Sequence, residues 1–165
     1  FMDAYEVIQA MVAKKYGKPT MSRKAIGDFM LSDTHAVNVK SNNVEKANYS
    51  PNMISIKMMH DWVFEQRKQL SFIFVDYKHG PGGMEILGET DPIPIEQISW
   101  DCLTIEAQGY GVIQMCDARK IVKDQTKRDF YVGFLKAYDK YRLKELRKHE
   151  RFAARFIKDV DTINW

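Results

Sequence analysis

The chain has 165 residues, of which 45% are hydrophobic and 28% charged, the composition of a folded domain with its own core. No apolar run approaches the roughly 18 residues that a membrane-spanning helix needs, which excludes a membrane-spanning protein. The first residues, FMDAYEVIQ, lack the basic and apolar regions of a signal peptide, so none is expected. We predict a single domain over residues 1–165.

In its first part the chain shows signals for a helix over residues 4–16, two strands near 25–31 and 35–40, and a polar loop over 41–50. Asp3 can cap the helix, and Gly17 with Pro19 ends it. The turn residues Ser32 to Thr34 join the two strands into a hairpin.

In its second part, Ser50 before Pro51 predicts a helix start, with the helix running to about Lys68. LSFIFVDY is typical of a buried strand, MEILG of a short strand, and DPIPIEQ of a loop. TIEAQGYGVIQMC indicates one or two strands broken at Gly109 and Gly111.

A long last helix is predicted from about Lys127 to beyond Arg151. Its start carries a capping box, Thr126 with Asp129. The side chains expected to face inward are Phe130, Phe134, Leu135, Tyr138 and Leu143. The element order αββαβββα predicts an α/β sheet flanked by helices.

Charge and cysteines add two further indications. The net charge is only +3, yet the segment from Arg119 to Lys158 holds 14 Lys and Arg against 5 Asp and Glu. Such a basic segment indicates a nucleic-acid binder, and the alternative is an ordinary solvated helix face. Two widely spaced cysteines, Cys102 and Cys116, suggest a reducing compartment, which we take to be the cytoplasm.

The hairpin carries the first candidate chemistry. Strand alternation puts Asn38 and Lys40 on one side, and pairing of the two strands would bring Asp28 beside them. A carboxylate and an amide oxygen are hard ligands that suit Mg²⁺, and an ammonium can orient a water or stabilise negative charge. These residues therefore predict phosphodiester hydrolysis. The alternative is an ordinary hairpin with one solvent-exposed face.

The pattern D-x(9)-N-x-K resembles the site of the PD-(D/E)xK nucleases. More specifically, AYEVIQAMVAKKYG, NVKSNN and NYSPNMIS are similar to the first helix, the catalytic strand and the following segment of type II restriction endonucleases of the HincII kind. The resemblance implies a restriction-endonuclease-like central mixed β-sheet flanked by helices. It also implies Mg²⁺-dependent cleavage of double-stranded DNA, with Mn²⁺ as a substitute, by a homodimer.

The same resemblance assigns roles to four residues. Asp28 would bind the metal, Asn38 would occupy the second ligand position, and Lys40 would position the attacking water. Glu6 would either bind or support the metal as a carboxylate that compensates for Asn38, or be an ordinary exposed helical residue. The family usually has Asp or Glu where this chain has Asn38, natural or engineered, and a neutral oxygen lowers the expected metal affinity. The chain is also shorter than most such enzymes. It would be either a minimal enzyme or a nuclease domain cut from a longer chain.

A literal D-x-K also occurs at Asp76-Tyr77-Lys78. Its upstream acid, Asp61, falls on a predicted helix, and no polar loop and helix follow it. We therefore interpret Asp76 and Lys78 as a strand end that reaches water.

Two segments are candidates for contact with DNA, because amides pair with base edges and lysines with phosphates. The first is the loop after the catalytic lysine, with Asn42, Asn43, Lys46, Asn48 and Tyr49; the second holds Gln108 and Tyr110. The alternative for both is an ordinary polar loop or a β-bulge. Three functions thus remain open: a restriction-like endonuclease, an inactive DNA-binding module on the same fold, and a homing or repair nuclease.

Overall fold

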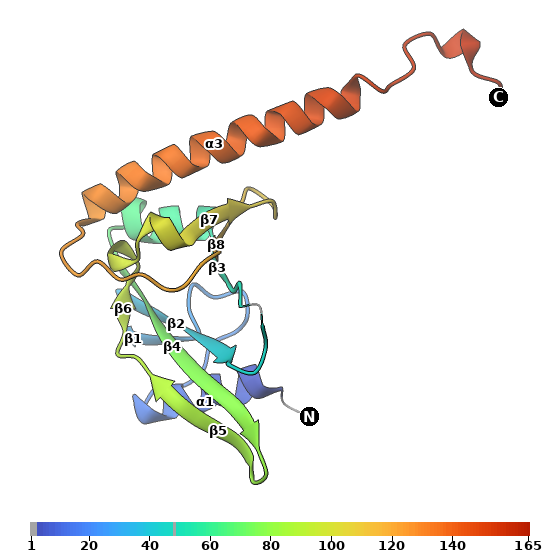
Figure 1. Cartoon of the computed structure of the whole chain (residues 1–165). Helices are drawn as coiled ribbons and strands as arrows, with labels where there is room; N and C mark the ends of the chain where they lie inside the picture. The colour runs from blue at the N-terminus through green and yellow to red at the C-terminus, as the bar shows by residue number, and fades with distance from the viewer. Residues whose placement is uncertain (1–2, 48) are drawn as a thin grey trace.

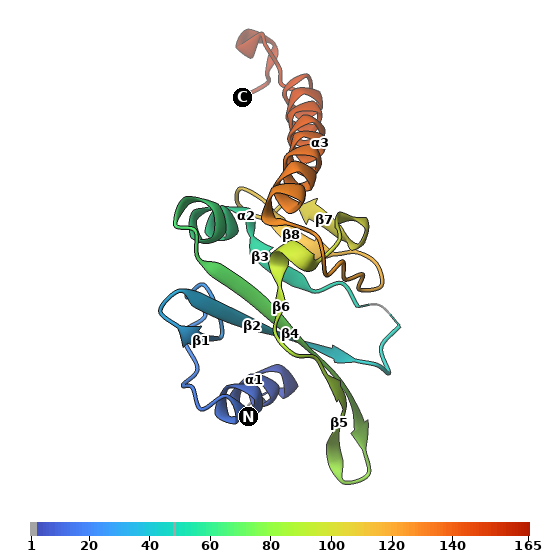
Figure 2. The same cartoon turned by 90° about the vertical axis from the view of Figure 1, so that its left-hand side faces the viewer.

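The centre of the protein is a five-stranded mixed sheet. The computed structural model describes residues 3–47 and 49–165. The strands are β1 (Phe29–Ser32), β2 (His35–Asn43), β4 (Gln69–Gly80), β5 (Gly83–Glu89) and β6 (Ile93–Pro94). Their order is β1-β2-β4-β5, with β6 also paired to β4, and only β2 and β4 run parallel (Figure 2). The mixed α/β sheet flanked by helices is therefore confirmed.

Helix α1 (Ala4–Lys15) covers one face of this sheet (Figure 1). The Asp3 side chain caps it by accepting a hydrogen bond from the Glu6 N–H at 2.9 Å. Ile8 and Val12 are buried against Val37 and Val39 of β2, and burial of each such side chain contributes about 1.5–3 kcal/mol. This packing fixes the helix beside the β1–β2 hairpin.

The opposite face of the central sheet carries the larger core. A second, antiparallel sheet lies there, with β3 (Asn52–Ser55), β8 (Val112–Met115) and β7 (Leu103–Glu106) in that order. The helical turn α2 (Ile56–Met59) leads into a π-helix over His60–Glu65. Three short 3₁₀ segments complete the fold, Ile95–Gln97, Trp100–Cys102 and Val160–Thr162.

The helix predicted from Pro51 to Lys68 is wrong at its start. Residues 52–55 form β3, because Met53 and Ile54 are buried where β3 pairs with β8. The helical segment begins only after Ser55, whose hydroxyl accepts a hydrogen bond from the Met58 N–H at 3.2 Å. The Ser-Pro pair resembles a helix cap locally, but pairing with a strand far along the chain overrides that preference.

Smaller differences concern strand ends. The first strand begins at Phe29 rather than near Ala25, and β2 runs on to Asn43 through part of the predicted loop. Part of the loop DPIPIEQ forms β6. The strands predicted in LSFIFVDY and MEILG are confirmed, as are the two strands broken at Gly109 and Gly111.

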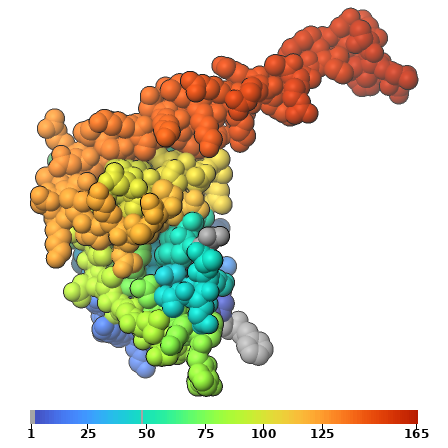
Figure 3. All heavy atoms as spheres, in the orientation of Figure 1, coloured from blue at the N-terminus to red at the C-terminus, as the bar shows by residue number. Residues whose placement is uncertain are grey.

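Helix α3 (Lys127–Ala153) packs on the second sheet through its first half only. Its capping box of Thr126 and Asp129 is confirmed. Phe130 is buried, its carbonyl accepts a hydrogen bond from the Trp100 indole at 3.0 Å, and the same indole closes directly on Gly133. The second half projects away from the body (Figure 3).

The inward positions predicted for α3 are therefore only partly correct. Phe134 is buried and Tyr138 packs against the core, whereas Leu135 is 48% and Leu143 39% exposed. Of the five positions predicted to face inward, only Phe130 and Phe134 are fully buried. Within the part of the chain that the structure describes, neither α1 nor α3 has the length and apolarity to cross a membrane. Cys102 and Cys116 are both free thiols.

Candidate active site

The β1–β2 hairpin fixes Asp28 against β2. The Asp28 N–H donates to the Val37 carbonyl at 2.8 Å, and its Oδ2 accepts from the Val39 N–H at 2.6 Å. Gly27, just before it, leaves no room for a side chain, since an added Cβ would lie 2.8 Å from the Val37 carbonyl. Backbone contacts on both sides therefore hold the carboxylate in one place.

Asn38 and Lys40 project from β2 into the same cavity as Asp28. Alternation of β2 sends Val37 and Val39 to the α1 side and leaves Asn38 and Lys40 on the other face. The Asn38 Nδ2 donates to the Ile26 carbonyl at 3.1 Å, which leaves the side-chain oxygen for another partner. The hairpin thus brings together the three residues that the sequence singled out.

Burial sets the electrostatics of the Asp28 and Lys40 pair. Burial raises the pKa of Asp28 above its ordinary value, while the Val39 N–H and the charge of Lys40 oppose that rise. Burial likewise lowers the pKa of Lys40, and the charge of Asp28 opposes that change. Each group therefore keeps its charge partly because the other is present.

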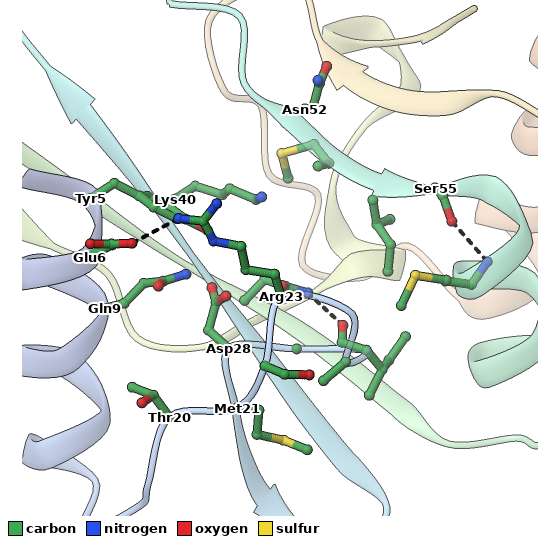
Figure 4. Close-up of a pocket in the computed structure, with 18 of the residues that line it drawn as sticks. Tyr5, Glu6, Gln9, Thr20, Met21, Arg23, Asp28, Lys40, Asn52 and Ser55 are labelled. Carbon is green, nitrogen blue, oxygen red and sulfur yellow. Dashed lines mark hydrogen bonds and ion pairs between the residues drawn. The ribbon is translucent and has the colours of Figure 1, made fainter. Parts of the chain in front are cut away.

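Helix α1 adds a second carboxylate and two uncharged polar side chains. Glu6, Tyr5 and Gln9 all line the cavity, and the Glu6 Oε1 lies 2.8 Å from the Arg23 Nη2 (Figure 4). Burial and the nearby Asp28 carboxylate raise the pKa of Tyr5 to about 12, so its hydroxyl stays protonated at neutral pH. Glu6, the fourth predicted residue, thus reaches the same cavity from a different element.

The cavity has a volume of about 840 Å³ and lies between the hairpin, α1 and the edge of the second sheet. Asn52, Ser55 and Gln108 line its far wall. Acidic and basic side chains meet in it, with Asp3, Glu6 and Asp28 against Arg23 and Lys40. An open cavity with both signs of charge suits an anionic ligand that binds together with a cation.

The donor set fits a hard cation such as Mg²⁺. The carboxylates of Asp28 and Glu6 and the side-chain oxygen of Asn38 are oxygen donors in one cavity, the type of ligand that Mg²⁺ selects. Among the described residues, the single group of three His, Cys, Asp or Glu side chains with ligand atoms within 4.8 Å is elsewhere, at His60, Asp61 and Glu65. With Asn38 in place of an acid, the predicted set therefore rests on two carboxylates.

The second D-x-K lies outside this cavity. Asp76 accepts a hydrogen bond from the Asn42 Nδ2 at 3.1 Å, and Lys78 pairs with Glu85 at 3.6 Å. Asp61 pairs with Lys57 at 3.6 Å on the helical segment. These contacts agree with the interpretation of Asp76 and Lys78 as a structural strand end.

Of the described residues that were predicted to contact DNA, only Gln108 lines the cavity. Tyr110 is 76% exposed and borders a separate aromatic pocket with His60, Tyr131 and Tyr138. Gln108 and Tyr110 therefore lie on one turn between two hollows.

The predicted loop after Lys40 is placed differently. Asn42 and Asn43 lie within β2, where Asn42 binds Asp76 and the Asn43 Oδ1 accepts from the Glu45 N–H at 3.0 Å. Lys46 is exposed. Asn48 lies outside the described residues. The Tyr49 hydroxyl is buried, and burial raises its pKa, which suits a structural side chain more than a base contact.

Several polar residues of the cavity were not found from the sequence, among them Tyr5, Gln9 and Arg23. The helix period offers a signal for two of them, because Gln9 follows Glu6 by three positions and Tyr5 by four, on the same face. Arg23 lies in a turn without a regular period, so no sequence pattern pointed to it.

Comparison with known proteins bears on the fold. No protein-family model matches the chain, and no curated protein matches it in sequence. Among solved structures it is similar to the NlaIV restriction endonuclease, with a TM-score of 0.50 and 13% sequence identity over 81% of this chain. The chain spans 62% of that protein's length. At this identity the likeness shows a restriction-endonuclease-like fold.

Proposed function

We propose that the protein is a metal-dependent endonuclease of the PD-(D/E)xK type that cleaves double-stranded DNA at specific sequences, as type II restriction enzymes of the HincII kind do. The observation that carries the proposal is the convergence of Asp28, Asn38, Lys40 and Glu6 in one cavity of a restriction-endonuclease-like fold. DNA, Mg²⁺ with Mn²⁺ as a substitute, and a second copy of the chain are part of the same proposal.

Each residue has a defined task in this proposal. Asp28, Glu6 and the oxygen of Asn38 would hold Mg²⁺. When bound, Mg²⁺ supplies a water of lowered pKa and offsets negative charge on the phosphate. Lys40 orients the attacking water and stabilises the developing charge through an ammonium that Asp28 keeps protonated. The backbone contacts of Asp28 hold this arrangement ready before DNA binds.

A homodimer follows from the reaction. Cutting both strands of a palindrome requires two equivalent sites related by a twofold axis. A homing or repair nuclease on the same scaffold would use the same residues, and the sequence of its cut ends would set it apart.

Asn38 favours a second candidate, a DNA-binding module that has lost cleavage. Its amide already donates to the Ile26 carbonyl, a structural use that an acid at this position would not have. In this second function the cavity would bind DNA phosphate without hydrolysing it.

One experiment separates the two functions. The protein and its Asn38→Asp variant are incubated with a mixed-sequence plasmid in Mg²⁺, in Mn²⁺ and in EDTA, and any ends are sequenced. Ends of defined sequence that appear with Mg²⁺ or Mn²⁺ but not with EDTA support the endonuclease. Binding without cutting by both proteins supports the inactive module, and absence of binding contradicts both.

A further inference from the structure

Arg23 is a cation at the mouth of the cavity that the mechanism above does not use. Its side chain is 91% exposed, and its guanidinium points across the cavity toward Glu6, where Nη2 and Oε1 are 2.8 Å apart (Figure 4). Among the described residues this carboxylate is its one hydrogen-bond partner. A cation that enters a reaction cavity from solvent is placed to meet an incoming anion.

The backbone ties Arg23 to the position of Asp28. Arg23 is an inner residue of a turn closed by the Ala25 N–H, which donates to the Ser22 carbonyl at 3.0 Å. The loop then returns on itself, because the Met21 N–H donates to the Asp28 carbonyl at 2.8 Å. Since Asp28 is itself fixed to β2, the turn is held directly over the proposed metal ligands.

The pair with Glu6 leaves most of the guanidinium unused. An arginine has five N–H donors in a planar fork that matches two oxygens of a phosphate. The printed contact with Glu6 involves one nitrogen. An ion pair this exposed is weak, so the guanidinium can leave Glu6 for a phosphate at little cost.

We propose that Arg23 is a phosphate-binding residue of this site, held by Glu6 in the free protein and transferred to a phosphodiester of the bound strand. The inference rests on the proposed function, in that DNA is taken as the ligand of the cavity. The transfer also frees the Glu6 carboxylate for the metal. Arg23 then contacts the phosphate, while Lys40, partly buried beside Asp28, serves the water.

Lys24 is the matched control for Arg23. It carries the same charge in the same turn and is exposed, but it does not line the cavity and makes no side-chain hydrogen bond or ion pair within the described chain. General attraction of DNA to a basic loop would involve the two residues equally. A phosphate contact built by the cavity would involve Arg23 alone.

The test measures binding of a duplex in EDTA over a series of salt concentrations, so that no cleavage intervenes. Arg23→Ala should weaken binding about five- to tenfold at low salt and reduce the slope of log K against log salt by about 0.9, the value for one lost phosphate contact. Arg23→Lys should keep the slope, and Lys24→Ala should match the wild type. A wild-type slope in Arg23→Ala, or an equal loss in Lys24→Ala, overturns the proposal.

A double-mutant cycle tests whether Glu6 binds Arg23 in the free protein and releases it to DNA. Glu6→Gln should tighten DNA binding in EDTA more strongly when Arg23 is present than in the Arg23→Ala background. An equal gain in both backgrounds means that Glu6 only repels DNA, and overturns the transfer. If the wild-type protein binds DNA but does not cut it, the nuclease proposal is contradicted. The salt slope of Arg23→Ala can still be measured and tests the phosphate contact by itself. Wild-type protein that does not bind DNA overturns both.

Discussion

Two regions of the molecule hold charged side chains in opposite ways. In the cavity, Asp28 and Lys40 are partly buried, backbone hydrogen bonds fix Asp28, and each group shifts the other's pKa. In the second half of α3, Lys144 and Arg147 are exposed, and their side chains make no hydrogen bond or ion pair within the described residues. Charged side chains are thus few and partly buried in the cavity, and many and exposed on the second half of α3.

The difference separates two kinds of contribution to a reaction on DNA. Fixed, partly desolvated groups stabilise a transition state, because they need no reorganisation when charge develops. Exposed cations attract phosphates of any sequence and are screened by salt. We therefore expect substitutions in the cavity to change turnover and substitutions on α3 to change affinity.

The largest effect is expected from Asp28→Asn. This change keeps the size of the side chain and an acceptor for the Val39 N–H, while it removes the charge of a proposed metal ligand. Cleavage should fall about 10³-fold, or about 4 kcal/mol of transition-state stabilisation. Calorimetric titration should show loss of Mg²⁺ and Mn²⁺ binding. The exposed acid Asp33 is the control position, and unchanged metal affinity in Asp28→Asn would place the metal elsewhere.

Lys40→Ala comes next, with cleavage reduced about 10²-fold or more. DNA binding should stay within about tenfold, or ~1.4 kcal/mol, because Lys40 does not belong to the exposed basic surface. The measurement is single-turnover cleavage beside equilibrium binding in Ca²⁺. Normal turnover in Lys40→Ala would contradict its role.

The shifted pKa values give the same pair a pH signature. The metal needs ionised Asp28, and burial raises its pKa above 3.8, so activity should fall on acidification at a higher pH than for an ordinary aspartate. Lys40 acts while protonated, and burial lowers its pKa below 10.5, so the alkaline limb should also move inward. Lys40→Arg, which stays charged, should lose the alkaline limb; a limb that persists belongs to another group.

Gln108→Ala should have an intermediate effect and act on specificity. Among the described residues, Gln108 is the one predicted DNA contact that lines the cavity. Its loss should cost about 1–3 kcal/mol of binding to the preferred site and little on random DNA. Tyr110→Ala, on the same turn but outside the cavity, is the matched comparison at one salt concentration. Equal losses on both kinds of DNA would show that Gln108 does not read bases.

Asn38→Asp should lower stability without metal and recover it with metal. An acid at this position loses the donor to the Ile26 carbonyl and places oxygen against oxygen. The expected cost is about 1–3 kcal/mol, a Tm lower by roughly 3–10 °C. Saturating Mg²⁺ should raise the Tm of Asn38→Asp more than that of the wild type. Asn43→Asp keeps its acceptor for the Glu45 N–H and should change little.

The smallest effect is expected on α3. Replacing Lys144 and Arg147 together by Ala should weaken binding to all sequences alike. It should also lower the salt slope by about 1.8, for two phosphate contacts. The measurement is a salt series on specific and random duplexes, and a loss confined to the preferred site would contradict this assignment.

The sequence predicted the hairpin of the candidate site because its signals are local. Strand alternation places Asn38 and Lys40 together, and a short turn between β1 and β2 is enough to bring Asp28 back beside them. The face of α1 that carries Glu6 follows from the helix period in the same way.

What the sequence did not predict depends on distant partners. β3 forms because Ile54 meets Ile113 nearly sixty positions later, and no local pattern announces that pairing. Asn42 stays in β2 because Asp76 of β4 lies opposite it. Arg23 enters the cavity through the path of an irregular turn, which only the folded backbone defines.

The close contact between the Trp100 indole and Gly133 has a mechanical consequence for α3. Gly133 lies twenty residues before the last residue of α3, which is about 30 Å of helix at 1.5 Å per residue. The helix packs on the core from Phe130 to Tyr141 and projects beyond it, so a tilt of the packed half is carried along the helix to its far end. A tilt of about 10° at the indole moves the far tip by roughly 5 Å, more than the rise of one base pair of about 3.4 Å. A methyl group added at Gly133 would therefore change the direction of the second half of α3 without changing any of its charges.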